Sequence, residues 1–368
     1  MTGNEEVYKA LQEHMDSFPV RFPKRKDQAE LRLLKRLFSP EEAKIATKLR
    51  FTPRPSETVD DIYPRVADLG ISKHDLEEVL DRMAKKGIIS YYRDGETKYY
   101  GNALWVLGIY EFQVDKLTPE LVADKQVFYG SPPTDNIQRT GISQMRTIPV
   151  AQSFRREESV AHYDDIQQLI EQAEGPFVVI NCVCRQEKDI IGEPCKVTDR
   201  RELCFGVGKF TQAYLDFGWG REVSKEEMLA VLEQNKNEGL VLQPSNTQDI
   251  EFVCSCCGCC CGGLASVQAV PRPVEYFTTN YYSAVNAELC TGCGTCEKLC
   301  QMSAITLDNG IAEINLDRCI GCGICVANCP SEAVQLVKKD TLHVPPEDFD
   351  EMYSQIAQRR KQLDETEK

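Results

Sequence analysis

Residues 289–310 read LCTGCGTCEKLCQMSAITLDNG, and residues 318–339 read RCIGCGICVANCPSEAVQLVKK. Both stretches place four cysteines at the spacing C-x2-C-x2-C-x3-C, and the second copy follows the first after 29 residues (319 − 290). Two-residue gaps let one tight loop present three thiolates to a single metal–sulfur cluster, and the glycines let the backbone pass close to it. The three-residue gap sends the fourth thiolate away from that loop. The repeat therefore predicts two neighbouring cluster sites.

This repeat resembles the cysteine pattern of the bacterial two-cluster ferredoxins, in which the fourth cysteine of each copy binds the other cluster. The resemblance implies that one [4Fe–4S] cluster is held by Cys290, Cys293, Cys296 and Cys329. It implies that the second is held by Cys319, Cys322, Cys325 and Cys300. Pro330 follows Cys329 as in the family, but Gln301 follows Cys300, which leaves the loop shape and reduction potential there open. A pair of zinc knuckles is the less favoured alternative.

The cysteine distribution indicates cofactor binding. All 18 cysteines of the 368-residue chain lie between Cys182 and Cys329, which disfavours disulfides as their purpose. The amino terminus has no basic start followed by an apolar core, so no secretory signal is expected. The longest apolar run, 103–110, is shorter than the roughly 18–20 residues of a membrane span. We therefore expect a soluble, cytoplasmic protein in a reducing setting.

Ten cysteines precede the repeat, in residues 161–270. A strand over 176–184 is expected to end with Cys182 and Cys184 on one face, and Cys204 is expected to precede an aromatic-rich helix. A second strand over 250–256 leads into the remaining cysteines, and neighbouring strands would bring the thiols to one sheet edge. The candidate metal ligands are Cys182, Cys184, Cys195, Cys204, Cys254, Cys256, Cys257 and Cys259. They predict one or two further iron–sulfur clusters, with a zinc site as the alternative.

The C-x-C-R segment, the later single cysteines and the C-x-C-C run resemble a group of large ferredoxin-like proteins of anaerobic microbes. That resemblance implies cluster binding and no particular reaction. Arg185 is interpreted as a surface arginine in a salt bridge, and charge stabilisation of a cluster is its alternative role. No glycine-rich nucleotide loop and no catalytic triad or carboxylate pair stands out.

Residues 27–112 resemble a winged-helix domain. Helices over 56–69 and 73–86 are joined by a turn at Gly70, and strands over 88–92 and 97–101 flank Asp94–Gly95. The second helix carries acidic residues that offset its basic ones, which weakens the attraction to phosphate. Protein docking or internal packing is therefore favoured over DNA binding.

The sequence predicts an α+β multidomain chain with a winged-helix-like front, an α/β cysteine-rich middle module and a carboxyl-terminal two-cluster ferredoxin-like domain. The expected parts are 1–26 (helix and basic linker), 27–112 (winged-helix-like), 113–160 (linker), 161–270 (cysteine-rich module), 281–340 (ferredoxin-like) and 345–368 (helix). The net charge is −14, with +4 in residues 21–102 (18 basic, 14 acidic) and −15 in 103–368 (24 basic, 39 acidic). Different partners are expected for the two parts.

An iron–sulfur electron carrier, or an electron-transfer subunit of an anaerobic oxidoreductase, explains these features best. Its expected partner is a redox protein or oxidoreductase complex, and the pattern favours a carrier over a stand-alone enzyme. The alternative is a redox-sensing winged-helix transcription regulator that binds DNA. A third hypothesis is a reductase that works at an unusual cluster in the middle module.

Overall fold

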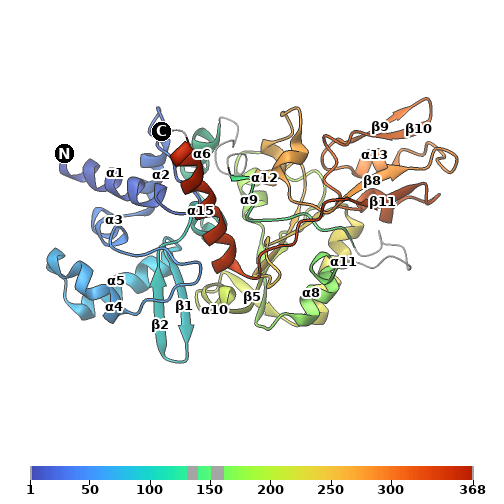
Figure 1. Cartoon of the computed structure of the whole chain (residues 1–368). Coiled ribbons are helices and arrows are strands. Elements are labelled where there is room, and N and C mark those ends of the chain that lie inside the picture. Colours follow the sequence, from blue (N-terminus) through green and yellow to red (C-terminus); the bar gives the residue numbers. More distant parts are fainter. Residues whose placement is uncertain (1, 131–139, 151–160, 367–368) are drawn as a thin grey trace.

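The computed structural model describes residues 2–130, 140–150 and 161–366. It is a mixed α/β chain of several parts, as the sequence predicts. Figure 1 shows the amino-terminal helices at one end, a central sheet, and the cysteine repeat at the other end. Residues 131–139 and 151–160, which belong to the expected linker, lie outside the described residues.

The front part consists of helices followed by a β-hairpin. The helices are α1 (Thr2–Asp16), α2 (Ala29–Leu37), α3 (Pro40–Ala46), α4 (Val59–Val66) and α5 (Lys73–Lys86), and the hairpin strands are β1 (Ser90–Asp94) and β2 (Thr97–Gly101). Ser39 and Glu42 form a reciprocal capping box that starts α3. Ser72 caps the start of α5, and Gly87 ends it in the left-handed conformation. The helix–turn–helix–hairpin order agrees with the sequence pattern.

One side of the hairpin packs against the middle module, while its tip, residues 93–97, is exposed. The hydroxyl of Tyr91 donates to Asp216 Oδ2 at 3.0 Å, and Arg93 forms an ion pair with the same carboxylate at 2.9 Å. Asp216 is the last residue of α10 (Gln212–Asp216). The ring of Phe217 lies 5.0 Å from that of Tyr91. The hairpin therefore joins two parts of the chain.

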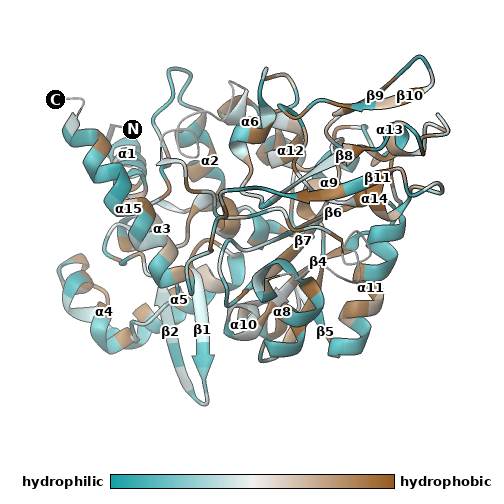
Figure 2. Ribbon diagram, turned by 45° about the vertical axis from the view of Figure 1, so that its right-hand side comes forward, coloured by the Kyte–Doolittle hydropathy of each residue, from teal (hydrophilic) through white to brown (hydrophobic). Residues whose placement is uncertain are grey.

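The middle module is built on a five-stranded antiparallel sheet in the order β5-β3-β4-β7-β6. Its strands are β3 (Phe177–Asn181), β4 (Glu202–Val207), β5 (Gly220–Val223), β6 (Val241–Pro244) and β7 (Phe252–Cys256). Alternate residues face opposite sides of a strand, so Val179 packs with helices α8 (Ile166–Gln172) and α11 (Lys225–Asn237), while Val178 packs with α10 and the front part. Figure 2 shows the hydrophobic strands enclosed by these layers.

Three expectations for this sheet are wrong. Strand β3 ends at Asn181, and Cys182 caps helix α9 (Val183–Ile190), so Cys184 is helical and the two cysteines do not share a strand face. Cys204 lies within strand β4, because residues 202–207 pair with β3 on one side and β7 on the other, and Cys204 faces Cys254 of β7 in this pairing. Strand β3, which leads to Cys182, and strand β7 are not neighbours, since β4 runs between them.

The cysteine repeat forms two small antiparallel pairs with two short helices. The pairs are β8 (Tyr281–Val285) with β11 (Val334–Lys338) and β9 (Ile305–Asp308) with β10 (Ile311–Ile314), and the helices are α13 (Thr295–Leu299) and α14 (Ile324–Ala327). Each helix follows a left-handed glycine, Gly294 or Gly323, so the sequence repeat is also a structural repeat. A further short helix, α12 (Gly262–Ser266), follows the cysteine run of the middle module.

The segment expected to be a linker, 113–160, contains ordered structure. Thr118 caps helix α6 (Pro119–Tyr129), and Asp124 on this helix accepts hydrogen bonds from Arg32 and Arg36 of α2. The backbone of residues 145–150 runs along β6, where the Ile148 N–H donates to Leu242 O at 3.3 Å. The linker prediction was wrong here because ion pairs and backbone pairing give a polar segment fixed neighbours.

The carboxyl-terminal helix α15 (Phe349–Thr366) lies across the front and middle parts. Its buried side contains Phe349, whose ring lies 6.2 Å from that of Phe252 in β7. Farther along the helix, Arg360 donates to the backbone oxygens of Asp16 and Phe18 at 2.8 and 2.5 Å. The helix therefore packs on the body of the chain. Within the described ranges, the search finds no helix with the length and hydrophobicity of a membrane span.

Candidate iron–sulfur and metal sites

One cavity in the repeat is lined by Cys290, Cys293, Cys296 and Cys329. Three of these cysteines come from the loop and first turn of α13, and the fourth follows α14. The Ala312 N–H of β10 points to Cys290 Sγ at 3.4 Å. An apolar cavity with converging thiols and an N–H aimed at sulfur fits a [4Fe–4S] cluster.

A second cavity is lined by Cys300, Cys319, Cys322 and Cys325. Backbone N–H groups of Ala304 and Ser283 lie 3.2 Å from Cys300 Sγ and 3.4 Å from Cys319 Sγ. Thiol donors with amide hydrogen bonds fit a second cluster in the same way. The structure thus brings together the two four-cysteine sets that the sequence predicted as ligands, including the exchange of Cys300 and Cys329.

Two glycines allow the backbone to pass close to its neighbours at these cavities. Gly292 and Gly321 have φ values of +68° and +64°. A Cβ atom at Gly292 would lie 2.3 Å from Gly310 O, and one at Gly321 would lie 2.2 Å from Tyr281 O. Both the left-handed backbone and the lack of space therefore require glycine.

The two cavities differ in exposure. Cys293 is exposed, and hydrogen bonds from Thr295 lower the pKa of its thiol. Cys325 is buried, and this burial raises the pKa of its thiol to about 12. A thiol must lose its proton before it binds metal. The metal affinity of a buried thiol with a raised pKa therefore depends more strongly on pH. Of the two cavities, the one that contains Cys293 is lined by the exposed cysteine.

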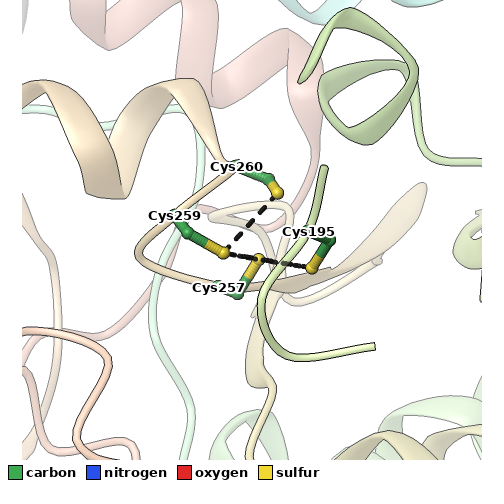
Figure 3. A group of neighbouring side chains, drawn as sticks. All are labelled: Cys195, Cys257, Cys259 and Cys260. Atoms are coloured by element: carbon green, nitrogen blue, oxygen red, sulfur yellow. Dashed lines mark hydrogen bonds between the residues drawn. The ribbon is translucent and has the colours of Figure 1, made fainter. Parts of the chain in front are cut away.

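In the middle module, four cysteines meet at one point, as Figure 3 shows. They are Cys195, Cys257, Cys259 and Cys260, and their sulfurs all lie within 4.8 Å of one another. We call them the four-thiol group. Cys195 follows the turn at Gly192, and the other three come from the loop between β7 and α12. The Cys195 sulfur lies 3.7 Å from that of Cys257 and 3.9 Å from that of Cys259.

The other six cysteines of the module form a row of neighbouring thiols. In order they are Cys184, Cys182, Cys204, Cys254, Cys256 and Cys261, and each side chain interacts with the next. We call them the six-thiol row. Strands β4 and β7 and the start of α9 supply five of them, so the sheet and not one loop assembles the row. All six are buried or half-buried.

Arg185 connects the four-thiol group and the six-thiol row. Its Nη1 donates to Cys182 Sγ at 3.3 Å and to Ser255 O at 3.2 Å, and its Nη2 donates to Cys257 Sγ at 3.3 Å. The side chain is only 1% exposed, so its interpretation as a surface arginine was wrong. No carboxylate forms an ion pair with it among the described residues. A buried cation requires anions, and the thiols on either side can supply them as thiolates.

The pKa shifts agree with this arrangement. Hydrogen bonding by Cys260, and then the charge of Arg185, lower the pKa of the Cys257 thiol to about 5. Hydrogen bonds from Cys184 and Cys204, with Arg185 adding to them, hold the pKa of Cys182 well below its ordinary value. The thiolate is the form of cysteine that binds metal.

Three of the eight candidate ligands from the middle of the sequence belong to the four-thiol group: Cys195, Cys257 and Cys259. The other five belong to the six-thiol row: Cys182, Cys184, Cys204, Cys254 and Cys256. Sequence reasoning missed Cys260 in the group and Cys261 in the row. Adjacent cysteines point in different directions, and only the fold of the loop shows which site each of them reaches.

The comparison with known protein families agrees with the geometry of the repeat. Residues 289–339 match the family described as the 4Fe-4S dicluster domain. The matched residues include every cysteine that lines the two cavities. A search of curated proteins finds no match to the chain. The chain therefore contains a ferredoxin-type iron–sulfur domain.

Proposed function

We propose that this chain transfers single electrons, as a carrier or as a subunit of an oxidoreductase complex. When bound, [4Fe–4S] clusters accept and release one electron at a time. The observation that carries the proposal is the pair of adjacent thiol-lined cavities. Cys296 and Cys300 lie at the two ends of α13 yet line different cavities, as do Cys325 and Cys329 at α14. One short helix therefore separates the two sites.

In this proposal each cavity holds one cluster. Cys290, Cys293, Cys296 and Cys329 bind the first, and Cys300, Cys319, Cys322 and Cys325 bind the second. The N–H groups of Ala312, Ala304 and Ser283 stabilise negative charge on the sulfurs to which they point. These donors favour the more negative, reduced state of the site.

The six-thiol row supplies the ligands of one further iron–sulfur cluster in this proposal. A cluster of the four-iron type needs four thiolates, so two thiols of the row remain as neighbours. Arg185 supports the assignment because its charge is buried against Cys182. The front part, with its hairpin packed on α10, serves as a docking or packing module.

The redox partner docks at the cavity that contains Cys293, because electrons leave most readily where a site approaches the surface. Residues 281–340 carry seven acidic and four basic side chains, a net charge of −3 (4 − 7). Exposed Leu289 and Ile311 lie beside this cavity. A partner with a basic rim and an apolar centre fits this surface, and opposite charges would speed its association.

Iron and acid-labile sulfide per chain, measured on anaerobically purified protein, test the proposal. We expect roughly twelve iron atoms with matching sulfide, and paramagnetic resonance signals of [4Fe–4S] clusters after reduction. Roughly eight iron atoms would restrict cluster binding to the repeat. A protein with zinc but no labile sulfide would contradict the proposal.

A redox-sensing regulator is the second candidate function. The observation that favours it is a physical connection between the row and the hairpin. Tyr214 of α10 lies beside Cys204 and Cys254, and Asp216 of the same helix binds Tyr91 and Arg93 of the hairpin. A change in the oxidation state of a cluster at the row can therefore affect the winged-helix-like part through helix α10.

Charge argues against this second candidate. Arg93 is paired with Asp216, and Lys98 is paired with Asp81 at 2.7 Å, so the hairpin presents little free positive charge to phosphate. Binding of genomic DNA fragments, measured at several salt concentrations in oxidised and reduced protein, decides between the two functions. Affinity that changes with cluster oxidation would support the regulator, and equal or absent binding would exclude it.

A further inference from the structure

The four-thiol group differs in size from the sites of the repeat. The Cys259 sulfur lies 3.5 Å from that of Cys257 and 3.6 Å from that of Cys260, and the Cys195 sulfur lies 3.7 and 3.9 Å from those of Cys257 and Cys259. In the described chain, no three sulfurs of either cavity of the repeat lie within 4.8 Å of one another. The same chain therefore contains wide four-cysteine sites and one narrow site.

The separation of the sulfurs indicates what each site can hold. Four thiolates bound to one tetrahedral ion, at a metal–sulfur distance of about 2.3 Å, lie about 3.8 Å apart (2.3 Å × 1.63). Four thiolates bound to separate corners of a cubane must lie much farther apart. The observed 3.5–3.9 Å separations agree with the single ion.

We propose that Cys195, Cys257, Cys259 and Cys260 bind one tetrahedral metal ion, zinc, and not an iron–sulfur cluster. Four thiolates and one divalent ion carry a net charge of −2. Arg185 offsets this charge from within the protein, 3.3 Å from Cys257, and a backbone N–H of Lys196 donates to Cys259. Zinc has no redox chemistry and suits four sulfur ligands in a closed structural site.

The ion stabilises the loop that contacts the ferredoxin-type domain. Gly258 lies between two of the ligands, and its N–H donates to Gln301 Oε1 at 2.9 Å. Gln268 donates to both Gly258 O and Gln301 O at 3.1 Å. A Cβ atom at Gly258 would lie 2.2 Å from Gln301 O, so the two backbones are in close contact. Gln301 follows Cys300, and both residues line the second cavity. The zinc site therefore holds in place the loop that contacts this cavity at Gln301.

The wild-type full chain provides the first test. Elemental analysis of anaerobically purified protein should find about one zinc per chain in addition to iron and sulfide. X-ray absorption at the zinc edge should show four sulfur neighbours at about 2.3 Å. Zinc absent after growth with added zinc, or zinc bound to oxygen and nitrogen, would overturn the proposal. Neither result depends on a variant that must fold.

Variants assign the ion to these four cysteines. Cys195 and Cys260 lie in different segments of the chain. Cys195→Ser and Cys260→Ser should each lose zinc, while their iron and sulfide contents stay at the wild-type level. Cys184→Ser, in the six-thiol row, is the matched control and should keep its zinc. Loss of about four iron atoms and four sulfides in Cys195→Ser or Cys260→Ser would show a cluster at this site and refute the proposal.

These results are distinguishable from a failure of the proposed function. Labile sulfide and the resonance signals report on the clusters, and zinc reports on the four-thiol group alone. Hydrogen–deuterium exchange gives a structural readout: removal of zinc from wild-type protein by a chelator should raise exchange in residues 257–261. Unchanged exchange after zinc loss would refute the loop-stabilising role.

Discussion

Arg185 illustrates how a single buried charge determines what its surroundings contain. Its guanidinium lies between Cys182 and Cys257, each at 3.3 Å, and no carboxylate neutralises it among the residues described. Neutral thiols would leave this charge uncompensated at a cost of several kcal/mol. Thiolates bound to metal remove that cost. The arginine thus favours metal-loaded thiolates on both of its sides.

Arg185→Met should lower the reduction potential of the cluster that we propose for the six-thiol row. The positive charge stabilises the reduced, more negative state, so its loss should shift the potential downward by on the order of tens of millivolts. An anaerobic redox titration monitored by paramagnetic resonance measures the shift. Arg185→Lys keeps the charge and should shift the potential less. The potentials of the two clusters of the repeat serve as the internal control.

Glu251 is predicted to make stability depend on pH. Its carboxyl group is 3% exposed, and this burial raises its pKa to about 7 although Arg54 lies 2.7 Å away and lowers it. Asp249 and Asp350 add negative charge nearby. The folded state therefore binds more protons than the unfolded state between pH 4.5 and about 7. The stability contributed by the protonated form is complete below this window and is lost as the pH rises through it.

Glu251→Gln removes this titration. The free energy of unfolding of the variant relative to wild type should increase by up to about 3 kcal/mol between pH 5 and pH 8. Anaerobic denaturant unfolding at several pH values measures the difference. Asp249→Asn removes one of the negative charges that raise the pKa of Glu251 and should therefore reduce the pH dependence of wild type. A constant difference for Glu251→Gln would contradict the prediction.

At the scale of elements, short turns determine where the cysteines go. The turn from β3 into α9 places Cys182 as the helix cap, and the pairing of β4 with β7 places Cys204 opposite Cys254. The cysteine that follows α13, Cys300, lines the second cavity. The cysteine that follows α14, Cys329, lines the first cavity. The loops that lead into α13 and α14 pass through Gly294 and Gly323 in the left-handed conformation, which glycine adopts easily.

Gly321→Ala should disrupt the second cavity. The added Cβ would lie 2.2 Å from Tyr281 O at a backbone φ of +64°, so β8 or the loop must move. We expect a loss of about four iron atoms per chain, the content of one cluster. Gly310→Ala is the control, because Gly310 has a φ of +81° but no neighbour within 4 Å. Equal iron content in the two variants would show that the close approach is unimportant.

At the scale of the whole molecule, contacts between distant segments join the parts, among them the ion pair of Arg54 with Glu251. The hairpin binds α10 through Asp216, α15 spans the front and middle parts, and Gln301 joins the second cavity to the Cys257–Cys261 loop. In Figure 1 the repeat lies at the end of the molecule opposite the front helices. In the proposed function, Gln301 lies at a contact through which electrons could pass between the middle module and the repeat.

Gln301→Leu should slow electron exchange between the six-thiol row and the repeat. Leucine removes the acceptor for Gly258 N–H and the donor to Gly239 O, at 2.9 and 3.0 Å, and so loosens the contact. A looser contact changes the position of the middle module relative to the repeat. The rate of electron exchange should fall by about an order of magnitude, while the iron content stays unchanged. Rapid-mixing reduction followed by freeze-quench paramagnetic resonance measures the rate.

Pro330→Ala is the matched control, because Pro330 occupies the equivalent position after Cys329 and is exposed. Its exchange rate should equal that of wild type. If Gln301→Leu and Pro330→Ala transfer electrons equally fast, the contact at Gln301 does not control the exchange. If both variants lose iron, Gln268→Leu loosens the same contact from outside the cysteine repeat.

The sequence by itself determined the ferredoxin-type domain, because ligand spacing within one short loop is a local property. Eight cysteines at a repeated spacing specify two sites without reference to the rest of the chain. The capped helices of the front part are also specified by neighbouring residues in the sequence. The sequence also indicated that Gln301 departs from the family pattern. It gave no reason for the departure, because the partner of Gln301 lies 43 residues away at Gly258.

Only the tertiary structure decided the arrangement of the middle cysteines. Their ten thiols come from two strands, a helix start and two loops, and sheet order determines which of them meet. The burial of Arg185, the division into a group of four and a row of six, and the narrow spacing of the four all follow from contacts between distant segments. Such contacts depend on how strands pair and pack, and residue spacing along the chain does not determine that pairing.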